Sequence, residues 1–288
     1  MSLPQVYGNS TEACVPGGIG ASITHGFEAD SSRFLASINS LRTPYLYVFL
    51  ILIAELASSF FVYWGIAVHA IVLVALLVHS VFAADKTLSS FLSVMAVAPV
   101  IRIVSLSCPL SNFNEVERFA IVSIPVIICA LTIVRTQHIS FREMGFAWPR
   151  LRYVPLELAV MALAVPIGFI EYQILKPEAI AEFELVKMVG PSLMFIFMTG
   201  FLEEWIFRGL MQNIAERLAG LHGIVCVSVL FGVLHTTNVA YWDIFLAGGA
   251  GFLFALVVRR TGSIWGVSLA HGIVNIVLFL VAPHLIAG

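Results

Sequence analysis

The chain has 288 residues, of which 60% are hydrophobic and 11% charged, and its mean hydropathy is +0.98. A soluble globular protein carries about 25% charged residues, so these values exclude a water-soluble enzyme and predict a chain surrounded largely by lipid. The formal charge of −2 and the scattered Lys and Arg residues exclude a basic surface for a nucleic-acid partner.

The predicted elements begin after a polar N-terminal segment, residues 1–44, whose Gly and Pro residues predict a flexible tail. From there on, apolar runs of helical length follow one another. Because lipid offers no partner for unpaired backbone groups, and because no segment alternates like a barrel strand, we predict an all-α polytopic membrane bundle of about eight or nine transmembrane helices. The expected spans lie near 45–63, 66–84, 88–107, 119–135, 154–175, 189–208, 221–237, 243–258 and 264–282.

Two of these spans are less regular than the others. The third, 88–107, contains Pro99 and Arg102, and the eighth, 243–258, is short and contains three glycines. Arg102 is a candidate for contact with a substrate carboxylate or for support of the site, although structural bonding between helices explains it equally well. Glu55, His69, His79 and Glu171 also lie in or near spans, with the same structural explanation.

The Lys and Arg residues predict the orientation of the bundle. Three of them, Arg118, Lys176 and Lys187, fall on one side of a nine-span arrangement. Ten fall on the other side, which predicts a cytoplasmic N-terminus and an external C-terminus, in the plasma (inner) membrane if the source is prokaryotic. The ten are Arg33, Arg42, Lys86, Arg135, Arg142, Arg150, Arg152, Arg217, Arg259 and Arg260.

The densest group of ionisable residues inside a span is Glu203, Glu204 and Arg208. A charge within the bilayer is costly, so such a group indicates a functional site. On a helix, Glu204 and Arg208 share a face and are expected to form an ion pair. Glu203 is turned about 100° away and is left without a cationic partner on its own helix. We therefore predict a structural role for Glu204 and a general acid–base role for Glu203, against the alternative of an ion-pair network that only fixes packing.

Two later spans carry further polar residues. His235 lies about one turn after Phe231, and His271 and Asn275 are four residues apart on one helix face. A single histidine in an apolar helix is more often structural, but a His–Asn pair beside Gly272, which permits close approach of a backbone or substrate, favours function. The helical rise lets Glu203 and the two histidines meet near the midplane or in the cytoplasmic half of the membrane.

Together these residues form the patterns EExxxR, FxxxH and HxxxN, in this order and on apolar helices. In this the chain resembles the CPBP family of intramembrane proteases, which includes the type II CAAX prenyl endopeptidases and bacteriocin-processing and self-immunity proteins. The resemblance covers about residues 154–282, so we divide the chain into the tail, N-terminal helices at 45–153 and a CPBP-like catalytic core at 154–288.

The resemblance implies a glutamate-dependent endopeptidase with an intramembrane cavity and a membrane-associated or lipid-anchored peptide as substrate. Glu203 then matches the catalytic glutamate and His235 its partner in activating water. His271 and Asn275 match the pair that stabilises the oxyanion, and Glu204 and Arg208 match the supporting positions. Whether the substrate is prenylated stays open.

A catalytic metal is not expected, although two glutamates and two histidines are chemically able to bind zinc. The HExxH helix of zinc proteases is absent from the sequence, and each histidine stands alone on its own span. We therefore predict no cofactor.

Two other functions stay open. The first is a proton- or ion-coupled transporter that uses the same glutamates and histidines as a relay, with the glycine-rich stretch 247–251 as the only indication of a broken helix. The second is a catalytically idle, immunity-type member of the family that protects a membrane partner.

Overall fold

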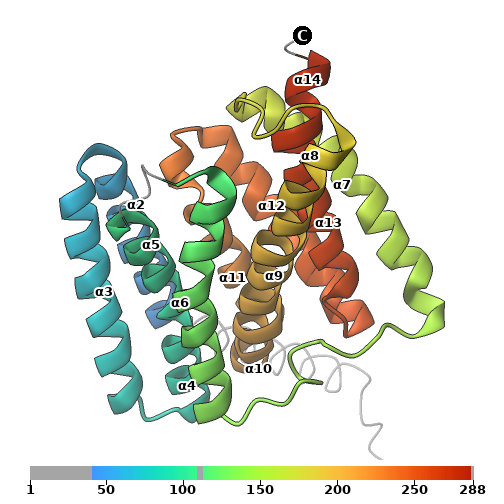
Figure 1. Ribbon diagram of the computed structural model, residues 1–288. Coiled ribbons are helices and arrows are strands. Elements are labelled where there is room, and N and C mark those ends of the chain that lie inside the picture. Colours follow the sequence, from blue (N-terminus) through green and yellow to red (C-terminus); the bar gives the residue numbers. More distant parts are fainter. Residues whose placement is uncertain (1–40, 109–112, 287–288) are drawn as a thin grey trace, which may run out of the picture.

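The computed structural model describes residues 41–108 and 113–286, and these residues form helices and no strand (Figure 1). Most of the predicted tail, 1–40, lies outside this part of the chain. The helices are α2 (Arg42–Phe60), α3 (Val62–Phe82), α4 (Lys86–Met95), α5 (Val97–Ser107), α6 (Glu115–Thr136), α7 (Val154–Leu175), α8 (Leu185–Met194), α9 (Leu202–Glu204), α10 (Asn213–Ala219), α11 (Leu221–Val233), α12 (Tyr241–Thr261), α13 (Trp265–Ile276) and α14 (Ala282–Ile286).

Nine helical stretches of the described residues are long and apolar enough to cross a membrane, which confirms the predicted all-α membrane bundle. The protein is therefore an integral, multi-pass membrane protein. The largest difference from the predicted spans is in the sixth stretch, which runs from Leu185 to Ala219 rather than over 189–208. Its 35 residues exceed the roughly 20 that cross a bilayer.

The two irregular spans differ in outcome. The third is divided at Ala96 into α4 and α5, and Pro99 lies in the first turn of α5, where its missing N–H is not needed. The eighth is one continuous helix, α12, from Tyr241 to Thr261. The helix break that the glycine-rich stretch 247–251 suggested is therefore wrong. The close approach of α11 and α12 instead depends on Gly232 of α11, where a Cβ would lie 2.6 Å from the Ile244 carbonyl oxygen.

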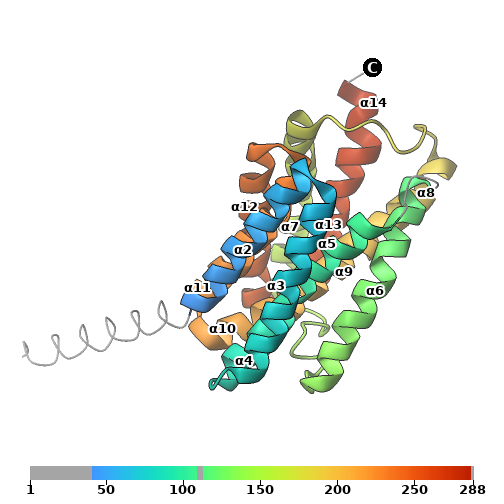
Figure 2. The same cartoon turned by 90° about the vertical axis from the view of Figure 1, so that its left-hand side faces the viewer.

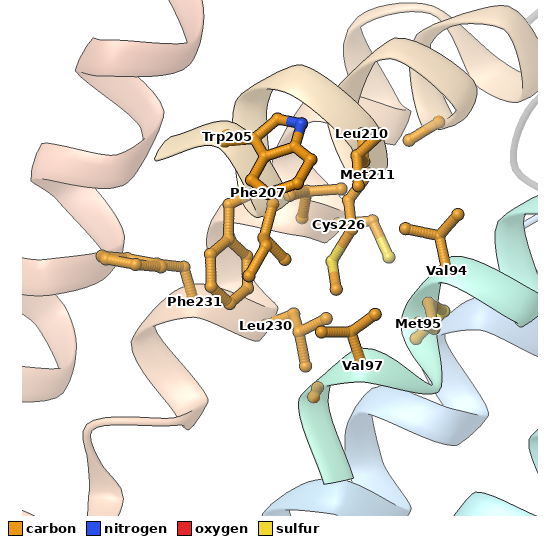
Figure 3. Close-up of a cluster of buried hydrophobic side chains, with 14 of the residues drawn as sticks. Val94, Met95, Val97, Trp205, Phe207, Leu210, Met211, Cys226, Leu230 and Phe231 are labelled. Atoms are coloured by element: carbon orange, nitrogen blue, oxygen red, sulfur yellow. The ribbon is translucent and has the colours of Figure 1, made fainter. Parts of the chain in front are cut away.

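The N-terminal helices pack directly on the C-terminal ones. In Figures 1 and 2, α2 to α6 form one side of the bundle, and α7, α12 and α13 form the other side. Figure 3 shows Val94, Met95 and Val97, from α4 and α5, facing Met211 and Leu230. One continuous buried apolar cluster thus joins both parts of the chain, so the helices before residue 154 support those that carry the motifs.

The sixth stretch has an unusual backbone around its two glutamates. Glu203 and Glu204 lie in the single α-turn α9, between two π-helical segments, η3 (Phe195–Phe201) and η4 (Trp205–Gln212). π-Helical turns are rare and frequently occur at functional sites. Before this turn, a Cβ on Gly200 would lie 2.5 Å from the Ser268 carbonyl oxygen and 2.7 Å from the Gly272 nitrogen. Glycine at position 200 therefore allows the close approach that brings α9 beside α13.

Candidate active site

Glu204 is the buried centre of the site. Its side chain is fully buried, and its Oε1 atom accepts hydrogen bonds from Arg208 Nη1 at 3.0 Å and from His271 Nδ1 at 2.9 Å. Because an ionised carboxylate only accepts hydrogen bonds, Nδ1 of His271 carries a proton. The predicted Glu204–Arg208 ion pair is therefore present, and His271 is an additional partner. Arg208 also lies over the Phe231 ring, 4.4 Å from its centroid.

Glu203 has a different environment from its neighbour. Its side chain is 34% exposed and lines a cavity, and its Oε2 atom lies 3.9 Å from Nε2 of His271. Arg208 pairs with Glu204 rather than with Glu203. Of the two adjacent carboxylates, Glu203 is thus the one that a water molecule or a substrate reaches.

His235 follows directly after α11 and is oriented by the backbone of that helix. Its Nδ1 atom lies 2.9 Å from the Phe231 carbonyl oxygen, and its ring contacts the Phe231 ring at 5.0 Å between centroids. A carbonyl oxygen only accepts, so Nδ1 is the protonated nitrogen and Nε2 of the neutral ring is an acceptor. The one-turn separation of Phe231 and His235 therefore determines the tautomer of the histidine.

Asn275 lies one turn after His271 on α13. Its Nδ2 atom donates to Thr199 Oγ1 at 2.8 Å, and Thr199 in turn donates to the Phe195 carbonyl oxygen at 2.6 Å. An amide nitrogen has two hydrogens, so the second one remains available for another acceptor.

These side chains meet in one cavity of about 630 Å³. The four predicted catalytic residues, Glu203, His235, His271 and Asn275, all line it. Glu204 and Arg208 lie behind this wall, fully or almost fully buried. Three sequence motifs that are separated by up to 72 positions therefore converge on the same space, although their chemical roles stay proposals.

The cavity is also lined by polar residues outside the three motifs. Arg102 of α5 and Glu171 of α7 line it, together with Thr199 and Asn238. Glu171 lies within electrostatic range of Glu203, Asp243 and His271. Arg102 and Glu171 stand out in the sequence as charged residues inside apolar spans. Only the folded chain shows that they face the cavity, because helical periodicity does not reveal which neighbour a face meets.

The cavity lies toward one end of the bundle. Figure 1 shows α14 and the α7–α8 connection at one end and α10 with the α6–α7 connection at the other. The cavity begins at Glu203, near the middle of the sixth stretch. It extends to Pro177 in the α7–α8 connection and Thr237 in the α11–α12 connection, both at the α14 end. The predicted basic connections, including Arg142 and Arg217, lie at the α10 end. The cavity thus runs from near the middle of the bundle toward the α14 end, and which end faces the cytoplasm stays a prediction from the basic residues.

No group of three or more His, Cys, Asp or Glu donors converges on one point within residues 41–108 and 113–286. His271 uses Nδ1 for Glu204, and His235 uses Nδ1 for a backbone carbonyl, so their remaining nitrogens approach the cavity from different helices. The absence of a catalytic metal therefore stays a prediction.

Comparison with known families gives one match. Residues 186–277 match the family model of the type II CAAX prenyl endopeptidase Rce1-like proteins. The match includes all six predicted site residues and overlaps the region of the resemblance. Comparisons with curated proteins and with solved structures found no match. All three motifs thus lie within the residues that match the Rce1-like model, which confirms the resemblance to the CAAX protease (CPBP) family.

Proposed function

We propose that the protein is an intramembrane endopeptidase that hydrolyses a peptide bond of a membrane-associated or lipid-anchored substrate with a water molecule activated by Glu203 and His235. The observation that carries the proposal is the convergence of Glu203, His235, His271 and Asn275 on one cavity among membrane-spanning helices. The Rce1-like match over the same residues supports a peptidase.

In the proposed mechanism, Glu203 removes a proton from a water molecule that also donates a hydrogen bond to Nε2 of His235. The water oxygen attacks the peptide carbonyl carbon. The oxyanion of the tetrahedral intermediate accepts hydrogen bonds from the free Nδ2–H of Asn275 and from Nε2–H of the His271 imidazolium, whose counter-ion is Glu204. Glu203 then transfers its proton to the leaving amine nitrogen as the carbon–nitrogen bond breaks.

The direct test uses purified protein in lipid vesicles that contain a membrane-anchored, fluorescence-quenched peptide. We expect the wild type to release fluorescence in the absence of any ion gradient. Proton uptake without peptide cleavage would contradict the proposal and would favour a transporter. Neither activity would favour an idle, immunity-type protein.

The position of the cavity predicts the side from which a peptide enters. Thr237 lies where the cavity meets the α14 end of the bundle, and the predicted orientation places this end outside the cytoplasm. In a cysteine-free background, Thr237→Cys is expected to react with a membrane-impermeant maleimide added to intact cells. An Arg142→Cys variant, at the α10 end, is expected to react only after lysis. The reverse pattern would place the cavity entrance on the cytoplasmic side.

The arrangement of donors also predicts that activity does not depend on a metal. Glu203 and the two histidines line one cavity, but they are not among any group of three donors close enough to hold one metal ion within the described residues. Removal of divalent ions by a chelator is therefore expected to change the rate of cleavage less than about 2-fold. The measurement is the initial rate before and after dialysis against chelator, with elemental analysis of the dialysed protein. A rate that disappears and returns with added zinc would contradict this prediction.

A further inference from the structure

A charged cluster inside the N-terminal helices lies outside the Rce1-like domain. Glu55 of α2 and His69 of α3 are both fully buried, and His69 Nε2 lies 3.5 Å from Glu55 Oε1. Arg102 of α5 donates from Nε to the same Glu55 oxygen at 2.8 Å. Burial of an ionised pair in an apolar environment is costly and adds little to stability. The cluster therefore requires an explanation beyond packing.

Arg102 connects this cluster to the candidate active site. Its Nη2 atom donates to the Leu234 carbonyl oxygen at 2.5 Å, and its side chain lines the cavity together with His235. Helix α11 ends at Val233, and the last carbonyls of a helix have no partner within it. Arg102 thus supplies a partner for the carbonyl group directly before His235.

This hydrogen bond acts on the backbone of His235. The Leu234 carbonyl and the His235 nitrogen belong to one planar peptide unit, so a bond that holds the oxygen also holds the direction in which the chain enters His235. The imidazole itself is bonded to the Phe231 carbonyl, which is part of the same segment. The position of the His235 ring therefore follows the backbone between Phe231 and His235.

We propose that Arg102 is a positioning residue for His235, and that the buried Glu55 carboxylate holds the Arg102 guanidinium in place for this purpose. The consequence for catalysis rests on the proposed peptidase function, whereas the positioning itself does not. Through this bond, helices α2, α3 and α5, which lie outside the matched domain, determine the geometry of a residue inside it.

The alternative that Arg102 instead binds a substrate carboxylate is less consistent with its surroundings. Two of its nitrogen atoms, Nε and Nη2, are already engaged, and Glu55 balances its charge. The two roles differ in kinetics, because loss of a substrate contact raises KM, whereas loss of positioning lowers kcat.

The test compares three variants of the full-length protein. Arg102→Lys keeps a positive charge beside Glu55 but cannot place two nitrogens of a planar guanidinium on Glu55 and on the Leu234 carbonyl. The double variant Glu55→Gln, Arg102→Met removes both charges together, so no uncompensated buried charge remains if the single variant folds poorly. Tyr47→Phe is the matched control, since it removes a 3.1 Å hydrogen bond to the Ala75 carbonyl within the N-terminal helices.

The first readout is the ¹⁵N NMR spectrum of histidine-labelled protein in detergent, with the His235 and His271 signals assigned from their alanine variants. We expect the His235 ring signals to shift or broaden in both Arg102 variants, while those of His271, which is held by Glu204, stay unchanged. Tyr47→Phe should alter neither histidine. Unchanged His235 signals in both Arg102 variants would overturn the proposal, whether or not the protein cleaves peptides.

The second readout is peptide cleavage. A displaced His235 is expected to lower kcat about 10- to 100-fold with KM within about 2-fold of the wild type, because small displacements of a catalytic group have effects of this size. A raised KM with unchanged kcat would overturn positioning in favour of substrate binding. If the wild type cleaves no peptide, the proposed function fails, and the NMR result still decides whether Arg102 positions His235.

Discussion

Replacement of Glu203 by glutamine is expected to lower the rate of peptide cleavage by about 10²- to 10⁴-fold, the range that a general acid–base residue contributes. Glutamine preserves the size of the side chain but does not take a proton from water or return it to the leaving amine. Because Glu203 is partly exposed to the cavity and Arg208 pairs with Glu204, the fold should not depend on this carboxylate. The measurement is kcat with the membrane-anchored peptide.

The matched control for this prediction is Glu182→Gln. Glu182 is exposed in the connection before α8, pairs with Lys187, and does not line the cavity. We expect wild-type kcat for the control and an unchanged unfolding midpoint for both variants. A Glu203→Gln protein that is folded and cleaves at the wild-type rate would remove Glu203 from the mechanism.

The largest expected effect on stability follows from Arg208→Met. Arg208 is 2% exposed and pairs with Glu204, which is fully buried. Removal of one partner of a buried ion pair costs about 3–5 kcal/mol, and here it leaves Glu204 with His271 as its remaining partner. We expect a correspondingly lower free energy of unfolding, measured by denaturant titration in detergent, and loss of cleavage because Glu204 also holds His271.

The control for Arg208 is Arg217→Met. Arg217 pairs with Glu143 at 3.1 Å, but both side chains are about half exposed, at 52% and 42%. Exposed pairs contribute about 0–1 kcal/mol, so this variant should unfold close to the wild type. Equal losses of stability in the two variants would show that burial of the Glu204–Arg208 pair has no special energetic role.

Much of the fold was predictable because few backbone structures satisfy their hydrogen bonds in lipid. Length and hydropathy predicted nine spans, and the described residues contain nine such helices. The errors are local. The extension of the sixth stretch to Ala219 was missed because its last turns carry Asn213, Glu216 and Arg217, which resemble a polar connection. The glycines of α12 suggested a break, but α12 is one continuous helix.

The sequence motifs predicted residues that the structure brings to one cavity, but they did not predict most of the contacts of those residues. Helical spacing correctly predicted that Glu204 pairs with Arg208. It did not predict that His271 bonds Glu204, that Asn275 bonds Thr199, or that Arg102 reaches the carbonyl before His235. Each of these contacts joins different helices, and one-dimensional periodicity contains no information about which helix faces lie opposite each other.

The sequence by itself determined that the protein is a helical membrane protein and which few polar residues are exceptional, because a charge in lipid is costly and therefore conspicuous. Only the tertiary structure decided that Glu203 faces the cavity while Glu204 is buried behind it, and that the cavity extends toward the α14 end. The physical reason is that burial and access depend on the packing of distant helices, such as the contact of η3 with α13 at Gly200. That packing also joins the N-terminal helices to His235 through Arg102.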